Sequence, residues 1–330
     1  MTPLYGHDEA IAAFRAALDS GRLHHAWLLA GPEGVGKALF ADKAALRVLA
    51  EGAGPPVTLP GLDTPDDHPV SKLAAAGSHP DLMRLERLTS ENGTDLARSI
   101  KVDQVRGLHR LFDTKPSLSS WRVVVIDAAD DLERPGASNA LLKMLEEPPV
   151  DTVFLLVSHM PERLMPTVRS RCRLLRFKPL GSDAMTSAMR AALPDANSEE
   201  IESLVRVGGG SPGRAIAGRG LDIAALDREM DTLVHYGDPT NARRSALAGS
   251  LSLKAAQPRY EAFLARAPSR IATAAKERAG QGRAEAIKLW ERAASLAGSA
   301  RRHSLDPGSV VFELAGMLAA LAGEAGRDAA

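Results

Sequence analysis

The sequence predicts an α/β domain built on a parallel sheet, followed by a small helical segment and an all-helical C-terminal domain. A glycine-rich loop joins a buried strand to a helix within residues 25–51. Two later apolar runs, at 121–127 and 152–159, are typical of strands buried on both faces of a sheet. Helical periodicity dominates the last third of the chain. A length of 330 residues accommodates two or three domains. We expect three, at 1–177, 178–220 and 221–330.

The composition excludes several classes of protein. The net charge is 0, with 45% hydrophobic and 25% charged residues, so the chain as a whole does not bind nucleic acid through bulk charge. A single cysteine, Cys172, excludes an intramolecular disulfide and a zinc site made of several cysteines. The first residues lack a signal-peptide core, and no apolar run approaches the roughly 20 residues of a membrane helix. We therefore expect a cytoplasmic protein.

The segment GPEGVGKA, residues 31–38, matches a phosphate-binding loop except at its last position. Gly31, Gly36 and Lys37 fit the pattern G-x-x-x-x-G-K-[ST], in which backbone N–H groups cradle phosphates and the lysine reaches them. Ala38 stands where a hydroxyl would hold Mg²⁺. A chance match is the alternative, but the preceding strand and the helical periodicity that follows are the context that such a loop requires.

Asp127 is a second candidate site residue, and the residue that follows it departs from the usual pattern. Asp127 ends the apolar run 123–126, where a Walker B aspartate holds Mg²⁺. An aspartate after a strand is weak support alone, but this one follows the loop lysine by about 90 residues. Ala128 stands where an active ATPase of this type has a glutamate that orients the attacking water. Ala38 and Ala128 together predict the loss of metal fixation and of water activation.

Two further segments have a chemical and a structural interpretation. Loop 51–80 contains His68 with three aspartates, and we favour an exposed acidic loop over a metal site because the spacing matches no ligand pattern: Asp63, Asp66 and Asp67. The segment 161–177 holds four arginines within eight residues: Arg169, Arg171, Arg173 and Arg176. They indicate either a solvated basic turn or a surface that presents a guanidinium to phosphate.

Five segments together resemble the bacterial clamp-loader ATPases of the AAA+ class. In the order found in that family, they are HPD (79–81), IKVDQVR (100–106), SNALLKMLEEPP (138–149), RSRC (169–172) and GGSPGRA (209–215). The resemblance covers roughly residues 20–220, and LLKxLEEPP combined with SRC is its specific part. Within the family, the chain looks most like the delta-prime subunits of the DNA polymerase III clamp loader.

The resemblance implies roles for individual residues. Arg171 would be an arginine finger that reaches the ATP of a neighbouring subunit, and Ser158 lies near the sensor-1 position. The sensor-2 arginine of active members falls on Gly213, one residue before Arg214. A degenerate nucleotide site would be formed by the P-loop and Walker B residues: Gly31, Gly34, Gly36, Lys37 and Asp127.

The departures from the family imply a non-motor subunit. The chain lacks the hydroxyl, the glutamate and the sensor-2 arginine of active members but keeps the finger motif. We expect a delta-prime-like part of the DNA polymerase III holoenzyme, a nucleotidyltransferase complex, that helps load the sliding clamp onto primer–template DNA. Expected partners are the gamma/tau ATPase subunits and the delta subunit, with no membrane and no functional homo-oligomer. No cofactor is expected to be required: weak ATP or ADP binding is left open, and the four-cysteine zinc module common in the family is missing from 51–80.

Residues 221–330 agree with the family only in length and helical character, and they resemble the collar through which clamp-loader subunits assemble. Ile287, Trp290, Ala294 and Ala297 align on one helical face. Residues 243–302 hold 13 lysines and arginines against 4 acidic residues. We favour a solvated face or a subunit contact there over a contact with DNA phosphates.

Two other functions stay open on the residues alone. The first is an active AAA+ ATPase motor of replication or repair, against which the alanines at 38 and 128 argue. The second is a nucleoside or small-molecule kinase, which would leave the SRC motif and the long helical tail without a purpose.

Overall fold

The computed structural model describes residues 2–89, 96–112, 114–303 and 305–322, with the side chains of all of these except 301–303. The chain divides into two compact units, Met1–Ile216 and Ala217–Ala330. The first contains every strand of the described residues, and the second is helical. The expected boundary at 177, between sheet and small helical segment, stays a prediction, and the end of the expected domain 221–330 lies outside the described residues.

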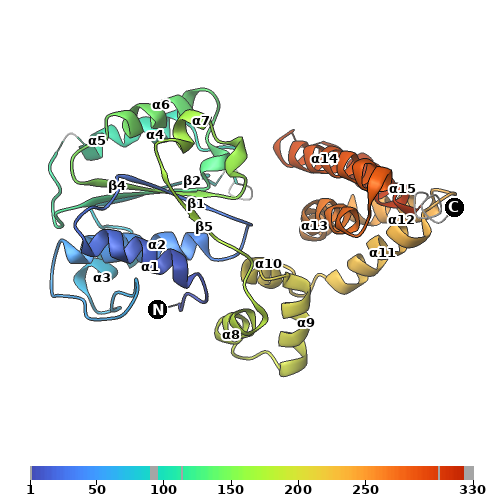
Figure 1. Ribbon diagram of the computed structural model, residues 1–330, viewed down its shortest axis with the longest axis horizontal. Helices are drawn as coiled ribbons and strands as arrows, with labels where there is room; N and C mark the ends of the chain where they lie inside the picture. Colours follow the sequence, from blue (N-terminus) through green and yellow to red (C-terminus); the bar gives the residue numbers. More distant parts are fainter. Residues whose placement is uncertain (1, 90–95, 113, 304, 323–330) are drawn as a thin grey trace. The chain divides into compact units, whose positions relative to one another are not determined.

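A five-stranded parallel sheet forms the centre of the first unit, in the order β2-β3-β4-β1-β5 (Figure 1). The inner strands β1 (Ala26–Ala30), β3 (Arg122–Asp127) and β4 (Thr152–Ser158) are buried almost throughout, as their apolar runs predict. The edge strands β2 (Leu82–Glu86) and β5 (Arg173–Arg176) were not expected, because exposed polar residues interrupt their short apolar pattern.

The parallel pairing decides which loops meet. All four strand pairs run in the same direction, so the loops that follow β1, β3 and β4 leave the sheet at one side, the carboxyl edge. The segments that enter the strands lie at the opposite side, the amino edge. Ligands of open parallel sheets bind at the carboxyl edge.

Helices cover both faces of the sheet (Figure 1). One layer contains α1 (Asp8–Asp19), α2 (Lys37–Glu51) and α3 (Pro69–Ala75). The other contains α4 (Val102–Gly107), α5 (His109–Phe112), α6 (Gly136–Glu146) and α7 (Pro166–Arg169), with short 3₁₀ turns η1 (Ala129–Asp131) and η2 (Pro161–Arg163) beside it. Each layer encloses an apolar core, and in the first the ring centroids of Phe14 and Trp27 are 4.9 Å apart. The predicted α/β fold class is confirmed.

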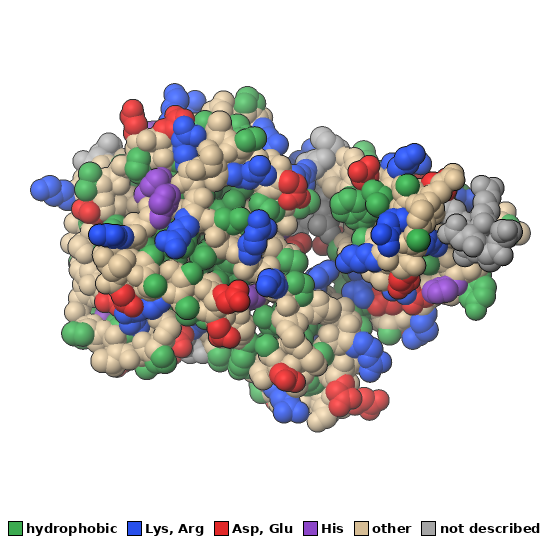
Figure 2. Space-filling model, in the orientation of Figure 1, with side chains coloured by type: hydrophobic (Ala, Val, Ile, Leu, Met, Phe, Trp, Pro, Cys, Tyr) green, Lys and Arg blue, Asp and Glu red, His purple; other side chains and the backbone are tan. Residues whose placement is uncertain are grey.

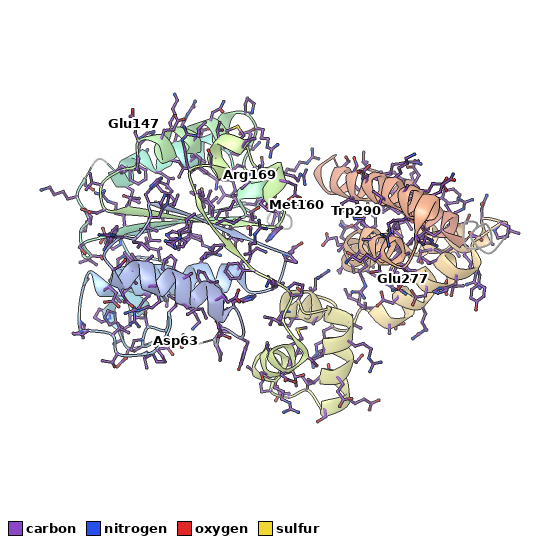
Figure 3. The ribbon with its side chains drawn as sticks, viewed as in Figure 1. Asp63, Glu147, Met160, Arg169, Glu277 and Trp290 are labelled. Carbon is purple, nitrogen blue, oxygen red and sulfur yellow. The ribbon has the colours of Figure 1, made fainter. Side chains whose placement is uncertain are left out.

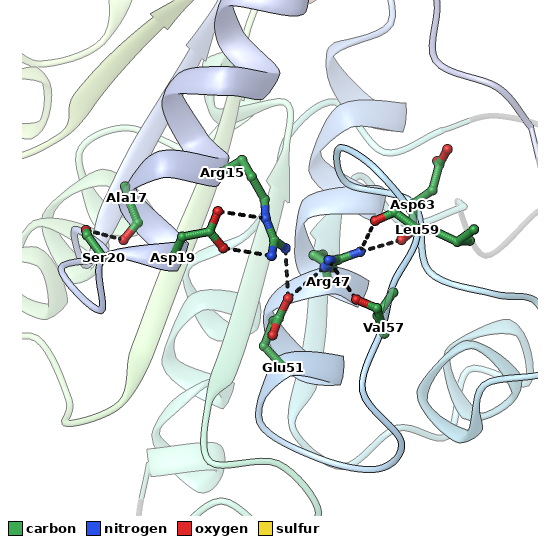
Figure 4. A network of polar contacts seen from close by, with 9 residues as sticks. All are labelled: Arg15, Ala17, Asp19, Ser20, Arg47, Glu51, Val57, Leu59 and Asp63. Atoms are coloured by element: carbon green, nitrogen blue, oxygen red, sulfur yellow. Dashed lines mark hydrogen bonds and ion pairs between the residues drawn. The ribbon is translucent and has the colours of Figure 1, made fainter.

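A buried arginine organises much of the loop between α2 and α3 (Figure 4). Arg47, with a side chain only 3% exposed, donates hydrogen bonds to the carbonyl oxygens of Leu59 (2.9 Å), Asp63 (2.8 Å) and Val57 (3.1 Å). Glu51 accepts from its Nε at 2.9 Å. A guanidinium has five donors in a fixed plane, so one side chain can tie together three points of a loop.

The same loop corrects two expectations. Residues 51–80 are not loop throughout, because α3 forms at Pro69–Ala75 with proline in its first turn. His68 is buried and caps this helix, since its Nδ1 accepts from the N–H of Val70 at 3.2 Å. The interpretation as an exposed acidic loop is therefore wrong for His68, and Asp63 forms an ion pair with Lys43. The described residues contain no group of three or more potential metal ligands.

Three helices follow β5 within the first unit: α8 (Ser182–Ala192), α9 (Ser198–Gly208) and α10 (Pro212–Ala217), which crosses its boundary. They enclose a small core of Met185, Met189, Ile201, Leu204 and Ala215. Asn197 caps α9, because its side chain accepts from the N–H of Glu200 at 2.8 Å. We call residues 178–216 the helical segment.

The second unit consists of α11 (Ile223–Tyr236), α12 (Ala242–Leu251), η3 (Lys254–Ala256), α13 (Gln257–Lys276), α14 (Gly280–His303) and α15 (Pro307–Ala320). The apolar α15 packs against the other four α-helices, and it buries Val311, Leu314 and Leu318 completely. None of the described helices is long and apolar enough to cross a membrane.

Helix α14 turns its largest apolar side chains outward. Ile287 and Trp290 are each 41% exposed. Trp290 is labelled in Figure 3. The buried positions are Gly282, Ala286, Ala293, Ala297 and Ala300. Of the face expected from the periodicity, only Ala297 is buried. The face that packs within the unit is thus lined mainly by alanines, with Leu289 and Leu296 half-buried beside it, and Ile287 and Trp290 remain on the surface.

Four arginines of the basic stretch 243–302 pair with acids that precede it. Arg266 donates to Asp227 at 2.7 Å and Arg270 donates to Asp231 at 2.5 Å, both joining α13 to α11. Arg243 pairs with Glu229 at 3.4 Å and Arg244 with Asp238 at 3.8 Å. On the visible face of this unit, acidic side chains lie among the basic ones (Figure 2). These pairs support a solvated, internally paired surface over a phosphate-binding one.

Candidate nucleotide site and basic turn

The P-loop occupies the carboxyl edge after β1 and leads into α2. Gly34 (φ 76°) and Gly36 (φ 108°) have left-handed backbone conformations that favour glycine. A Cβ at Gly31 would lie 2.1 Å from the carbonyl oxygen of Phe177, so the loop also packs too closely on the chain after β5 for any side chain there. Ala38 is the second residue of α2 and presents only a methyl group. The local sequence therefore folds as a P-loop, but without its metal ligand.

Lys37 is folded back onto its own loop. Its side chain is buried, with the residue 2% exposed, and Nζ donates to the carbonyl oxygens of Gly31 (2.7 Å) and Pro32 (2.5 Å). Burial lowers the pKa of Lys37 to about 8, although nearby Asp130, Glu33 and Asp127 act in the opposite direction. The ammonium thus has acceptors without a phosphate.

The helical segment docks directly on the P-loop. Ser211 is fully buried, and its hydroxyl donates to the carbonyl oxygen of Glu33 at 2.7 Å. The N–H of Gly213 donates to the carbonyl oxygen of Gly34 at 2.8 Å. A Cβ at Gly213 would lie 2.8 Å from the Cα of Gly34, and one at Gly34 would lie 2.6 Å from the Ser211 hydroxyl. The two backbones approach so closely that residue 213, the expected sensor-2 position, has no space for an arginine.

Asp127 also has an internal partner. Arg84 on β2 donates to its carboxylate at 3.0 Å and to Glu86 at 3.2 Å, and it forms an ion pair with Asp42. Burial opposes the charge of Arg84, but Asp42 and Asp127 beside it raise the pKa of the guanidinium overall. Arg84 thus stands as a fixed positive charge against the Walker B carboxylate. The sequence gives no signal for this contact of Arg84, because β2 lacks the continuous apolar run of an inner strand.

A second acidic side chain reaches the carboxyl edge from η1. Asp130 accepts from the hydroxyl of Ser158 at 2.8 Å and from the N–H of His159 at 2.5 Å. Burial and the charge of Lys37 lower the pKa of His159, which favours the neutral imidazole. Ser158, near the expected sensor-1 position, therefore ties β4 to the turn after β3. The double aspartate after Ala129 was the available sequence signal for this contact.

The five predicted site residues Gly31, Gly34, Gly36, Lys37 and Asp127 lie at the carboxyl edge, as parallel topology requires. They do not fit the hydrolysis of Mg²⁺-bound ATP. Ala38 offers no oxygen, Ala128 no base, and the Asp127 carboxylate is paired with Arg84.

Arg171 lies on the opposite side of the sheet. It precedes β5, and the strand register pairs Arg173 with Trp27 at the start of β1, while Arg176 pairs with Ala30 next to the P-loop. The strand between them separates the two sites by roughly 10 Å along its length, at about 3.3 Å per residue. Arg171 is therefore at the amino edge and faces away from the chain's own P-loop.

The turn around Arg171 is well anchored. Val168 is buried, and its carbonyl oxygen accepts from the N–H of Arg171 at 3.2 Å and from Cys172 Sγ at 3.2 Å. Burial raises the pKa of the Cys172 thiol to about 12, so it serves packing and not chemistry. The guanidinium of Arg173 stacks 4.8 Å above the Trp27 ring.

Known proteins resemble this chain over more than half of its length. Residues 6–181 match the family model described as DNA polymerase III, delta subunit. The DNA polymerase III subunit delta' of Pseudomonas aeruginosa is 38% identical over 188 residues, which are 57% of this chain and 53% of that protein. The gamma/tau subunit of Mycobacterium tuberculosis is 32% identical over 212 residues, 63% of this chain and 34% of that protein.

The chain thus spans about half or less of the length of these curated relatives. Among solved structures, a DNA polymerase III gamma subunit-related protein from Thermotoga maritima is 14% identical, with 94% of this chain and 99% of that chain covered and a TM-score of 0.39. The family match extends over more than half of the residues, from the helix before β1 to the chain after β5. The chain therefore belongs to the DNA polymerase III delta subunit family.

Proposed function

We propose that this chain is a non-motor, delta-prime-like subunit of the DNA polymerase III clamp loader. It supports ATP-dependent loading of the sliding clamp onto primer–template DNA and hydrolyses no ATP itself. It supplies Arg171 to the nucleotide of a neighbouring ATPase subunit. Family membership supports the assembly, and the two edges of the sheet support the division of roles.

The state of the P-loop carries the non-motor assignment. Lys37 bonds to its own loop, and Ser211 and Gly213 bond to the next two carbonyls. A productive nucleotide would have to draw Lys37 away from the carbonyls of Gly31 and Pro32, and it would still find neither a metal hydroxyl nor a base. We infer that no nucleotide is required here and that any ATP or ADP binding is weak.

The amino edge supports the role in trans. Arg171 is 35% exposed on its side chain, follows a turn fixed by Val168, and lies across the sheet from its own P-loop. A guanidinium is always charged and binds phosphate oxygens through a planar fork. A finger supplied by one subunit to another needs this combination of exposure, fixed backbone and distance from its own site.

The proposed partners are the gamma/tau-type ATPase subunits and the delta subunit, and through them the clamp and DNA. The outward Ile287 and Trp290 on α14 supply an apolar surface that suits a subunit contact. No zinc is proposed, because Arg47 performs the cross-linking of the loop after α2. Elemental analysis that finds about one zinc per purified chain would contradict this part.

The test measures ATP turnover twice, with the isolated chain and with the reconstituted complex. The isolated chain should show no turnover above background. In the complex, Arg171→Ala should lower DNA-stimulated hydrolysis and clamp loading without loss of assembly, whereas the neighbouring Arg169→Ala should not. Turnover that co-purifies with the isolated chain and disappears in Lys37→Ala would instead establish the alternative, an active motor.

A further inference from the structure

Arg171 has a carboxylate partner that belongs to the LEEPP segment. Its Nη2 lies 2.8 Å from Oε1 of Glu146, the last residue of α6, and its Nη1 donates to the carbonyl oxygen of Thr167 at 2.9 Å. The two contacts approach the guanidinium from different elements, α6 and α7. They occupy two of the five N–H donors that an arginine carries, so the group keeps donors for an incoming oxyanion.

Stability does not account for this ion pair. The side chains of Arg171 and Glu146 are 35% and 42% exposed, and pairs at such positions contribute little to folding because water screens them. Two prolines follow at 148 and 149 and stop α6 immediately after the pair. The helix thus ends where its last carboxylate meets the guanidinium.

Orientation is the property that the pair does change. A free arginine side chain on a surface samples many rotamers, and a group that must meet a transferring phosphoryl oxygen loses rate when it is misplaced by about 1 Å. The Thr167 carbonyl alone fixes one end of the planar fork, and a second acceptor fixes the plane itself. Glu146 is that second acceptor.

We propose that Glu146 is a positioning residue for Arg171, which holds the guanidinium in the plane and direction needed to contact a nucleoside triphosphate bound by the neighbouring subunit. Glu146 itself does not touch the nucleotide. The inference rests on the proposed function, because it assigns Arg171 its task. It links two motifs that are about 25 residues apart in sequence, LEEPP and SRC, through one side-chain contact.

The test uses the reconstituted complex and four variants of this chain: Glu146→Ala, Glu146→Gln, Glu147→Ala and Arg171→Ala. Glu147 is the matched control, because it is the adjacent exposed carboxylate (Figure 3). Glu146→Ala should lower the DNA-stimulated kcat for ATP by roughly 3- to 10-fold with the KM for ATP unchanged, since orientation acts on the transition state and not on ground-state binding. Glu146→Gln keeps an acceptor oxygen at the same place and should retain most of the rate. Glu147→Ala should behave as the unmodified chain.

A double variant separates positioning from a general defect. If Glu146 acts through Arg171, the variant Glu146→Ala/Arg171→Ala should be no slower than Arg171→Ala alone. Additive losses would overturn the proposal, and so would a normal or raised rate for Glu146→Ala beside an impaired Arg171→Ala. An Arg171→Ala complex with full activity would overturn the proposed function itself, whatever Glu146 does.

Discussion

The two edges of the same sheet have opposite characters. At the carboxyl edge, Lys37 and Asp127 are satisfied by groups of this chain, and the helical segment lies on the P-loop. At the amino edge, Arg171 is held by two acceptors but remains partly exposed. At the edge where parallel sheets bind ligands, the charged groups already have partners within the chain, whereas the guanidinium at the other edge is partly open to solvent. A P-loop architecture can therefore form without the residues that hydrolysis needs, and under the proposed function the opposite edge is the one that contacts another subunit.

The largest expected effect on DNA-stimulated hydrolysis comes from changing Arg171. Arg171→Lys in the reconstituted complex should be almost as impaired as Arg171→Ala, with an expected loss of about 10- to 100-fold in DNA-stimulated hydrolysis. A lysine lacks the planar fork. Arginine fingers raise the rate of related phosphoryl transfers by roughly 10³- to 10⁵-fold. The expected loss is smaller here because Arg171 serves only one of several ATP sites in the complex. Rates are measured by phosphate release with assembly checked by gel filtration. Full rescue by lysine would show that charge alone matters and that the fork does not.

A substitution in the helical segment can disrupt its contact with the P-loop. Gly213→Arg forces a side chain to within 2.8 Å of Gly34 Cα and should lower the free energy of unfolding by about 1–3 kcal/mol. Gly181→Ala is the control, because a Cβ at Gly181 meets nothing within 4 Å. Denaturant titration measures both. Equal stability of the two variants would mean that the docked arrangement is not the one in solution.

Much of this contrast could be anticipated from the sequence. The apolar runs of β1, β3 and β4 identified the central strands. Ala38 and Ala128, which stand where active members have a hydroxyl and a glutamate, predict a degenerate site. Local pattern could not show which groups replace the missing ligands. Arg84 reaches Asp127 from an edge strand 43 residues away, and Ser211 reaches Glu33 across 178 residues.

Two features of the fold could not be read from the local pattern. The edge strands β2 and β5 each bury only one residue, so their sequences lack the continuous apolar run that marks an inner strand. Helix α14 has an apolar stripe containing Ile287 and Trp290, but the stripe faces outward and alanines face the core. Periodicity reveals that a helix has a face; it does not reveal what covers that face.

The buried Lys37 predicts a pH effect on stability. The pKa of Lys37 is about 8 in the folded chain against 10.5 for an ordinary lysine, so between these values the unfolded chain binds more protons. The free energy of unfolding should therefore rise with pH across that window, relative to a chain without this group. The expected gain is on the order of 1 kcal/mol, and Lys37→Met should remove it. Denaturant titrations at several pH values between 7.5 and 10 measure the difference. Parallel curves for the two chains would show that Lys37 is not buried as a charged group.

The smallest expected effect comes from repairing the carboxyl edge one group at a time. Ala38→Thr restores the hydroxyl that holds Mg²⁺, yet the isolated variant should still show no ATP turnover above background. Residue 128 remains an alanine, so the attacking water stays unoriented, and Asp127 remains paired with Arg84. Adding Ala128→Glu should also fail, because Arg84 still neutralises the Asp127 carboxylate and residue 213 still lacks the sensor-2 arginine. Phosphate release with excess Mg²⁺ and ATP is the measurement, and a catalytically intact P-loop ATPase confirms that the assay responds. Turnover by Ala38→Thr alone would show that the metal ligand was the only missing part.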